Sequence, residues 1–267
     1  MSKPFNWKIF FILVVAATIG LIAIIPYSLA LQGPGALARA AAATSMPLPL
    51  LFAVQIGAQV IIFAVAIWVG ISFANSIGLG LPIVESALKG EPVGEKIKAI
   101  LPISIILGVV GGLLIIPLDL FVFHPALVAQ LGAAANPLVV RSASTPTWWQ
   151  GLLASFYGGL DEEILLRLCV LSFLAWLGRF VAKTAEGQPT VAVFWIANVI
   201  AAILFGLGHL PATANLVPIT PLVVLRAVVL NGLIGVAAGY LYFTRGLESA
   251  MISHFSADII LHVLFAI

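Results

Sequence analysis

The chain has 267 residues, of which 62% are hydrophobic and only 8% are charged, and its net charge is +2. A soluble domain carries roughly 25% charged and 45–50% apolar residues, so this composition excludes an ordinary soluble enzyme and indicates a polytopic membrane protein. The single cysteine, Cys169, excludes a disulfide framework and a CxxC metal site. The sequence has neither a basic patch interleaved with aromatic residues nor a glycine-rich phosphate loop, so we expect no nucleic acid partner.

Several apolar segments are long enough to cross a membrane, which requires about 20 residues in a helix. The sequence therefore predicts an all-α fold, a polytopic transmembrane helical bundle of about seven or eight membrane helices. The seven candidates cover roughly 9–31, 49–76, 98–123, 150–176, 191–210, 217–243 and 247–267.

The basic residues in the connecting segments predict the orientation of these helices. If the N-terminus is cytoplasmic, Arg39 and Arg141 fall outside, and the other basic residues of the connections fall inside, as the positive-inside rule requires. The inside residues are Lys3, Lys8, Lys89, Lys96, Lys98, Arg179, Lys183 and Arg245. We therefore expect an integral membrane protein with a cytoplasmic N-terminus, and we take a bacterial inner membrane as its setting. Residues 1–30 resemble a secretory signal, but their apolar run exceeds the usual length of roughly 7–15 residues, so we expect an uncleaved helix.

Ionisable residues within the predicted spans concentrate after about residue 150. Each costs roughly 2.5–3.5 kcal/mol at bilayer depth and is a candidate functional residue. We therefore expect one membrane domain over 1–267, with accessory N-terminal helices in 1–148 and a catalytic core in 149–267. The candidate residues at bilayer depth in that core are Asp161, Glu162, Glu163, Arg167, His209, Arg226, His254, Asp258 and His262.

The spacing of these residues predicts how they meet. Glu163 and Arg167 are four residues apart, so they share a helix face and can form an ion pair, whereas Glu162 points about 100° away. His254 and Asp258 have the same spacing, so Asp258 can orient the ring of His254 or share a target with it.

Structural rather than catalytic roles are expected for three other polar residues. Asp161 is expected to cap a helix that begins after Gly158 and Gly159. His262 is expected to be a polar residue near the outer end of the last helix, and Arg226 to snorkel or to pair internally.

The predicted depths of two histidines in the membrane are unfavourable to a single active site. His209 ends the fifth span near the outer surface, whereas His254 lies about 10 Å from the inner end of the seventh, which separates them by about 15 Å in depth. A shared site requires a tilted fifth helix, a deeper start of that helix, or a break near Gly158 and Gly159.

Carboxylates and imidazoles on three helices are the groups that hydrolysis needs. A carboxylate can take a proton from water, one imidazole can hold the water, and the other can donate to the oxyanion of an attacked carbonyl. The same groups could bind zinc, with Glu162, His209 and His254 as ligands. Because HExxH is absent, we expect that no cofactor is required, with zinc as the alternative.

Three motifs occur in order in the second half of the chain. EExxxR is Glu162, Glu163 and Arg167; FxxxH is Phe205 and His209; HxxxN/D is His254 and Asp258. Over about 150–262, their order and spacing resemble the CPBP family, which contains type II CAAX prenyl endopeptidases and bacterial proteins linked to bacteriocin processing or self-immunity.

The resemblance implies an intramembrane endopeptidase. Its substrate would be a membrane-anchored peptide, either a prenylated CAAX-like peptide or another kind. In that family Glu162 would activate water, His209 would position it, and His254 and Asp258 would line the oxyanion side. Glu163 and Arg167 would support the helix that carries Glu162. Asp258 stands where Asn is commoner, and an Asp side chain donates a hydrogen bond only when it is protonated. The family has been described both as glutamate proteases and as metalloproteases.

Two other functions are open at this point. A non-catalytic immunity or scaffold protein predicts the loss of a motif residue, but the three motifs are present here with only the Asn-to-Asp variation. A proton or metal transporter predicts polar residues and broken helices in both halves, whereas these residues cluster in one half. The expected partners are membrane lipid and a membrane-anchored peptide or protein substrate.

Overall fold

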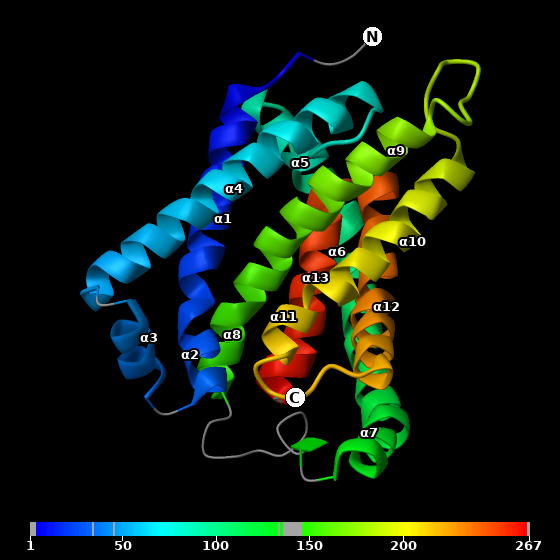
Figure 1. Cartoon of the computed structure of the whole chain (residues 1–267). Coiled ribbons are helices and arrows are strands. Elements are labelled where there is room, and N and C mark those ends of the chain that lie inside the picture. The colour runs from blue at the N-terminus through cyan, green and yellow to red at the C-terminus, as the bar shows by residue number, and fades with distance from the viewer. Residues whose placement is uncertain (1–3, 34, 45, 133, 136–145, 266–267) are drawn as a thin grey trace.

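A computed structural model describes residues 4–33, 35–44, 46–132, 134–135 and 146–265, which are mostly helical (Figure 1). Within these ranges the only β contact is an isolated bridge between Lys183 and Pro189. The first half contains α1 (Trp7–Ala23), α2 (Ile25–Gln32), α3 (Ala36–Thr44), α4 (Leu48–Ser76), α5 (Pro82–Leu88), α6 (Gly94–Leu118), the π-helix η1 (Asp119–Phe123) and α7 (His124–Leu131). The second half contains α8 (Trp148–Phe156), the π-helices η3 (Tyr157–Glu162) and η4 (Ile164–Leu171), α9 (Ser172–Gly178), α10 (Val191–Gly208), α11 (Leu210–Thr213), α12 (Pro221–Arg245), α13 (Leu247–Asp258) and the π-helix η5 (Ile259–Leu264).

The predicted membrane spans are confirmed as helices. Within the described part of the chain, six are long and apolar enough to cross a membrane: Trp7–Gln32, Leu48–Ser76, Gly94–Leu131, Val191–Thr213, Pro221–Arg245 and Leu247–Leu264. The segment expected at 150–176 is one helical path from Trp148 to Gly178, although it carries four charged residues in its middle. The protein is therefore an integral membrane protein with a polytopic helical bundle.

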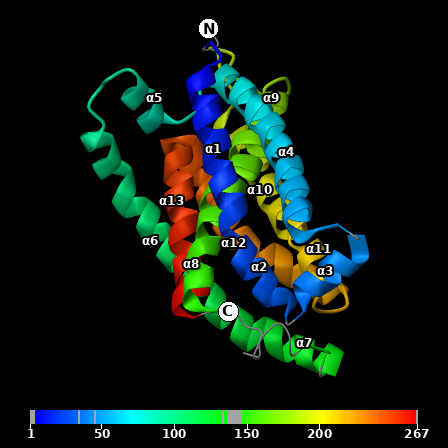
Figure 2. The same ribbon diagram turned by 90° about the vertical axis from the view of Figure 1, so that its left-hand side faces the viewer.

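The path 148–178, which we call the central helix, lies in the middle of the bundle (Figures 1 and 2). Its η3 and η4 segments contact α1 and α4 on one side and α13 and α10 on the other. Helix α12 packs against both α10 and α13, and α6 packs along α13. The charged residues of the central helix are thus enclosed by spans from both halves of the chain.

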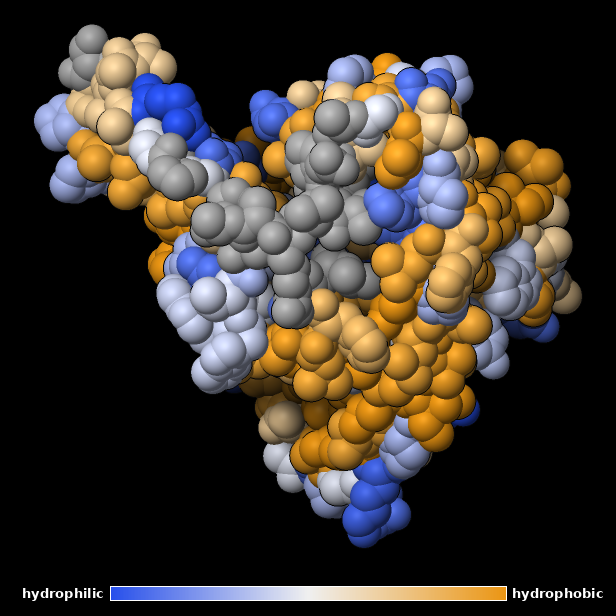
Figure 3. Space-filling view, turned by 90° about the horizontal axis from the view of Figure 1, so that it is seen from below, coloured by the Kyte–Doolittle hydropathy of each residue, from blue (hydrophilic) through white to orange (hydrophobic). Residues whose placement is uncertain are grey.

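Apolar side chains serve two purposes in this bundle. Leu13, Ile67, Leu168, Ala201 and Ala250 belong to one buried cluster that joins α1, α4, η4, α10 and α13. Many large apolar residues instead remain on the outside, and Figure 3 shows hydrophobic residues over much of one side of the molecule. An exposed apolar surface of this kind suits contact with lipid tails.

A two-pronged ion pair joins the third span to α12. Arg226 Nε and Nη2 lie 2.6 Å from Asp119 Oδ1 and Oδ2, respectively. The side chains of Arg226 and Asp119 are 19% and 9% exposed. The internal pairing considered for Arg226 is therefore confirmed, with a partner on η1 that the sequence did not identify.

Replacing Asp119 with alanine should destabilise the protein by about 3–5 kcal/mol, because it leaves the Arg226 charge buried without its partner. Thermal unfolding of the purified protein in detergent measures the effect. The matched control is Glu95→Ala, which breaks the exposed Lys98–Glu95 pair and should cost at most about 1 kcal/mol. Equal losses in the two variants would contradict a structural role for the Asp119–Arg226 pair.

Candidate active site

The central helix carries its carboxylates on π-helical turns rather than after a break. Residues 157–162 and 164–171 are π-helical, and the path continues through Gly158 and Gly159. The expected break is therefore wrong, and so is the role of Asp161 as an N-cap. π-Helical turns are rare in proteins and frequent at functional sites.

Asp161 lies against the first span. It is fully buried, and a Cβ atom added at Gly20 of α1 would overlap its Oδ2 atom. Among the described residues, neither carboxyl oxygen has a hydrogen-bond partner. The close approach of α1 to η3 therefore depends on the missing side chain at Gly20.

The predicted ion pair between Glu163 and Arg167 is confirmed. Their Oε1 and Nη1 atoms are 2.9 Å apart, and the side chains are 0% and 1% exposed. Arg167 Nη2 also donates to the carbonyl oxygen of Gly235 on α12 at 3.0 Å. Its guanidinium lies 5.0 Å from the centre of the Phe205 ring on α10, a cation–π distance. One buried arginine thus joins the central helix to two other spans.

Glu163 also orients His254 on α13. Glu163 Oε1 lies 2.7 Å from His254 Nδ1, and because an ionised carboxylate only accepts, Nδ1 is the donor. Asp258 was considered either for orienting His254 or for sharing a target with it, and its Oδ1 lies 3.7 Å from Nε2, beyond hydrogen-bond distance. The remaining nitrogen of His254, Nε2, therefore faces Glu162 and Asp258.

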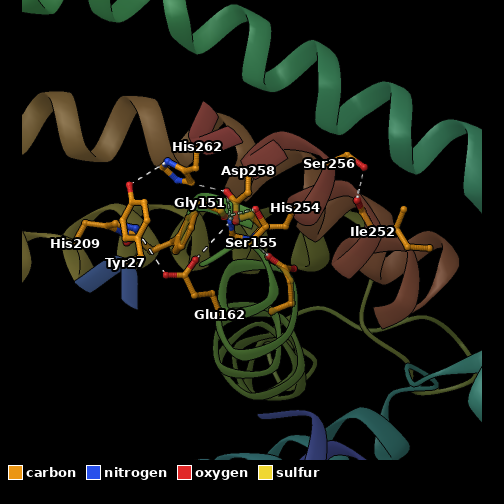
Figure 4. A network of polar contacts seen from close by, with 12 residues as sticks. Tyr27, Gly151, Ser155, Glu162, His209, Ile252, His254, Ser256, Asp258 and His262 are labelled. Atoms are coloured by element: carbon orange, nitrogen blue, oxygen red, sulfur yellow. Dashed lines mark hydrogen bonds and ion pairs between the residues drawn. The ribbon is translucent and has the colours of Figure 1, made fainter. Parts of the chain in front are cut away.

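Glu162 faces both motif histidines (Figure 4). Its Oε2 lies 3.5 Å from His254 Nε2, and its Oε1 lies 3.8 Å from His209 Nε2. The Glu162 side chain is 20% exposed, whereas the adjacent Glu163 is fully buried. Of these two neighbouring carboxylates, only Glu162 can therefore be reached by a water or a substrate.

The FxxxH motif determines which ring nitrogen of His209 carries the hydrogen. His209 Nδ1 lies 2.9 Å from the carbonyl oxygen of Phe205 in the last turn of α10, where backbone carbonyls have no partner within the helix. Because a carbonyl only accepts, Nδ1 carries the hydrogen, and in the neutral ring Nε2 is an acceptor that faces Glu162. The Phe205 ring meets the rings of His209 and His254 edge to face, at 4.9 and 5.4 Å.

The depth difference expected between His209 and His254 does not arise. Helix α10 crosses the bundle obliquely and ends beside the lower part of the central helix (Figure 1). Of the geometries considered for a shared site, the structure therefore has the tilted fifth span.

Gly158 allows α13 to approach the central helix closely. A Cβ atom at this position would overlap Asp258 Oδ2 and lie 3.2 Å from His254 Nε2. Asp258 is 7% exposed and His254 is 4% exposed. The glycine that was expected to break the helix instead makes room for two site residues.

The structure brings together all of the residues predicted for the site: Glu162, Glu163, Arg167, Phe205, His209, His254 and Asp258. It adds His262, whose Nε2 lies 3.9 Å from Asp258 Oδ1, and Tyr27, whose hydroxyl oxygen lies 3.2 Å from His262 Nδ1. Spacing gave no signal for Tyr27, which is 235 positions from His262.

The three residues considered as ligands in the zinc alternative do lie close together. However, in the part of the chain that the structure describes, no group of three or more His, Cys, Asp or Glu side chains is arranged to hold a metal ion. Glu162, His209 and His254 therefore do not fit a zinc site as they stand.

Residues 144–260 match the family model of the Rce1-like type II CAAX prenyl endopeptidases. This stretch of the chain is a domain of that family. It contains Glu162, Glu163, Arg167, Phe205, His209, His254 and Asp258. Comparisons with curated proteins and with solved structures found no match. The match to the Rce1-like family supports membrane protease activity of the CAAX type in general.

The two neighbouring glutamates should differ in their effect on stability. Glu163→Ala should cost about 3–5 kcal/mol, because Arg167 keeps its buried charge without a partner. Glu162→Ala should cost under about 1 kcal/mol, because that side chain is partly exposed and its histidine contacts are long. Unfolding of both variants in detergent tests the difference, and equal losses would contradict it.

Gly158→Ala should destabilise the protein by about 1–3 kcal/mol, because the new methyl group forces α13 away from η3. The control is Gly57→Ala on α4, where an added Cβ meets no atom within 4 Å. That change should be neutral or stabilising by about 0.5–1 kcal/mol, since alanine is the better helix former. Thermal unfolding would contradict the close approach at Gly158 if both variants behaved alike.

Proposed function

We propose that the protein hydrolyses a peptide bond of a membrane-associated substrate with water that Glu162 activates. The observation that carries the proposal is the position of Glu162, which is partly exposed and faces the Nε2 atoms of His209 and His254. The match to the Rce1-like family supports the reaction class. We place the catalytic core in 149–267 and treat 1–148 as accessory helices.

Water can be held between Glu162 and His209. The 3.8 Å gap between Glu162 Oε1 and His209 Nε2 is longer than a direct hydrogen bond, and a water between them would donate one hydrogen to each acceptor. The hydrogen bond from Nδ1 to the Phe205 carbonyl keeps Nε2 an acceptor. His209 therefore orients the water, and the carboxylate acts as general base.

The reaction then proceeds in two steps. Glu162 takes a proton from the water as its oxygen attacks the substrate carbonyl carbon, and the carbonyl electron pair moves to the oxygen. As this oxyanion returns its electrons, the C–N bond breaks, and Glu162 gives its proton to the leaving nitrogen. The products are a carboxylic acid and an amine, so protons and electrons balance.

His254 and Asp258 lie on the other side of Glu162 and line the oxyanion side. Glu163 accepts from Nδ1 and fixes the ring of His254, so when the ring is doubly protonated its Nε2 can donate to the oxyanion without reorienting. Asp258 Oδ1 lies 3.7 Å from the same Nε2. It therefore acts on the oxyanion mainly through His254.

The family match and the position of the site within the helical bundle support one substrate class. We assign a membrane-anchored peptide, with prenylated CAAX-like peptides as the first candidates, because the matched family is that of prenyl endopeptidases. The distribution of Lys and Arg supports a cytoplasmic N-terminus, and we place the protein in a bacterial inner membrane.

Three alternatives differ from this proposal. A non-catalytic immunity or scaffold protein would bind its partner equally well without Glu162. A zinc protease would need a rearranged site, since Glu162, His209 and His254 do not form a metal group as they stand. A proton or metal transporter is disfavoured because the polar residues gather around one carboxylate rather than along a path through both halves.

Glu162→Gln should lower the rate of peptide cleavage by about 10²–10⁴-fold, because the amide cannot act as a base. The assay compares wild type and variant in detergent, on a farnesylated CAAX peptide and on the same peptide without the farnesyl group. Glu85→Gln, which changes a carboxylate on α5 outside the site, is the control and should keep the wild-type rate.

A chelator arm separates the two protease types. Cleavage that survives chelation and disappears in Glu162→Gln supports the metal-free mechanism. Cleavage that chelation removes and zinc restores would assign the reaction to a metalloprotease. Undiminished cleavage by Glu162→Gln would overturn the assignment of the base.

A further inference from the structure

The polar network of the site extends beyond the family motifs to the first span. From Asp258 it continues to His262 on η5, with 3.9 Å between Oδ1 and Nε2, and then to Tyr27 on α2, with 3.2 Å between Nδ1 and the hydroxyl oxygen (Figure 4). The rings of Tyr27 and His262 meet edge to face, with centres 5.4 Å apart. Both residues lie outside 144–260.

The backbone beside Tyr27 is fixed to the central helix. Gln150 Nε2 donates to the carbonyl oxygen of Pro26 at 3.2 Å. Pro26 also lies in the first turn of α2, where its ring presets the helical backbone angle. Helix α2 contacts α8, so the hydroxyl of Tyr27 is held by a short and rigid connection to the helix that carries Glu162.

Donors and acceptors along this chain have one consistent direction. Asp258 Oδ1 faces His262 Nε2 at 3.9 Å, which is too long for a hydrogen bond, but an ionised carboxylate at this distance favours the tautomer with hydrogen on Nε2. In that neutral tautomer Nδ1 is an acceptor, and the hydroxyl of Tyr27 is its donor. The hydroxyl therefore selects the tautomer of His262 that faces Asp258 with a hydrogen.

We propose that Tyr27, acting through His262, is a positioning residue that holds Asp258 in place on the oxyanion side of the active site. The inference rests on the proposed function, since it takes Asp258 to line that side. It assigns a role in catalysis to the first span. It also gives a reason for an aspartate at this position, since the carboxylate faces a ring nitrogen of His262 on one side and of His254 on the other.

Cleavage kinetics of the full-length protein in detergent test the proposal. Tyr27→Phe keeps the ring and removes only the hydroxyl, and it should lower kcat about three- to tenfold, the value of one lost hydrogen bond, with KM unchanged. Tyr240→Phe on α12, outside this network, is the matched control and should keep the wild-type kcat.

His262→Gln should lower kcat by the same factor. The double variant, Tyr27→Phe with His262→Gln, should be no slower than the slower single variant, because the two residues act through one contact. Additive losses, or a Tyr27→Phe enzyme with wild-type kcat, would overturn the proposal. A loss that appears in KM alone, or only together with a lower unfolding temperature, would also overturn it in favour of a packing role.

A second readout does not depend on activity. In the wild-type protein with ¹⁵N-labelled histidine, the ring resonances of His262, assigned by their loss in His262→Gln, should show hydrogen on Nε2 and none on Nδ1. Tyr27→Phe should shift the Nδ1 resonance, and Tyr240→Phe should not. An unmoved Nδ1 resonance would overturn the proposal even if Glu162→Gln confirmed the base. A shift without any peptide cleavage would place the failure in the proposed function instead.

Discussion

The buried ion pair between Glu163 and Arg167 is the constraint on which the site depends. Removing two charges from water costs several kcal/mol for each ion, and this cost is offset only by close pairing with further hydrogen bonds. Here the pairing distance is 2.9 Å, the Gly235 carbonyl accepts from Arg167, and His254 donates to Glu163. The central helix, α12 and α13 must therefore meet at one point. A shift of α12 or α13 would remove one of the hydrogen bonds that support this buried pair.

The ion pair also separates the roles of two adjacent carboxylates. Glu163 is fully buried and committed to Arg167 and His254, whereas Glu162 is partly exposed and meets its histidines at 3.5 and 3.8 Å. Glu163 is closed off from solvent by the ion pair to Arg167 and the hydrogen bond from His254, so it cannot meet a water or a substrate. Glu162 avoids such bonds, while its neighbour provides the rigid support that an active site needs.

Much of this arrangement could be predicted from the sequence. Composition indicated the helical bundle, the i, i+4 spacing predicted the Glu163–Arg167 pair, and the three motifs marked the residues that gather around Glu162. Contacts between distant parts of the chain could not be predicted in this way. Spacing suggested that Asp258 orients His254, but Glu163 does so from another helix, 91 positions away. The glycines at 158 and 159 resembled a helix break, since propensity does not report that a neighbouring helix needs the space.

The contacts of the first half of the chain indicate why the Rce1-like domain is not surrounded by lipid alone. A buried carboxylate at Asp161 would be costly to expose to lipid tails, and α1 covers it at Gly20. On the opposite side, α6 packs along α13, the helix of His254 and Asp258. Asp119 then joins the end of this third span to α12. The first and third spans thus enclose the central helix and α13 from two sides, which keeps the charged residues of the domain away from lipid.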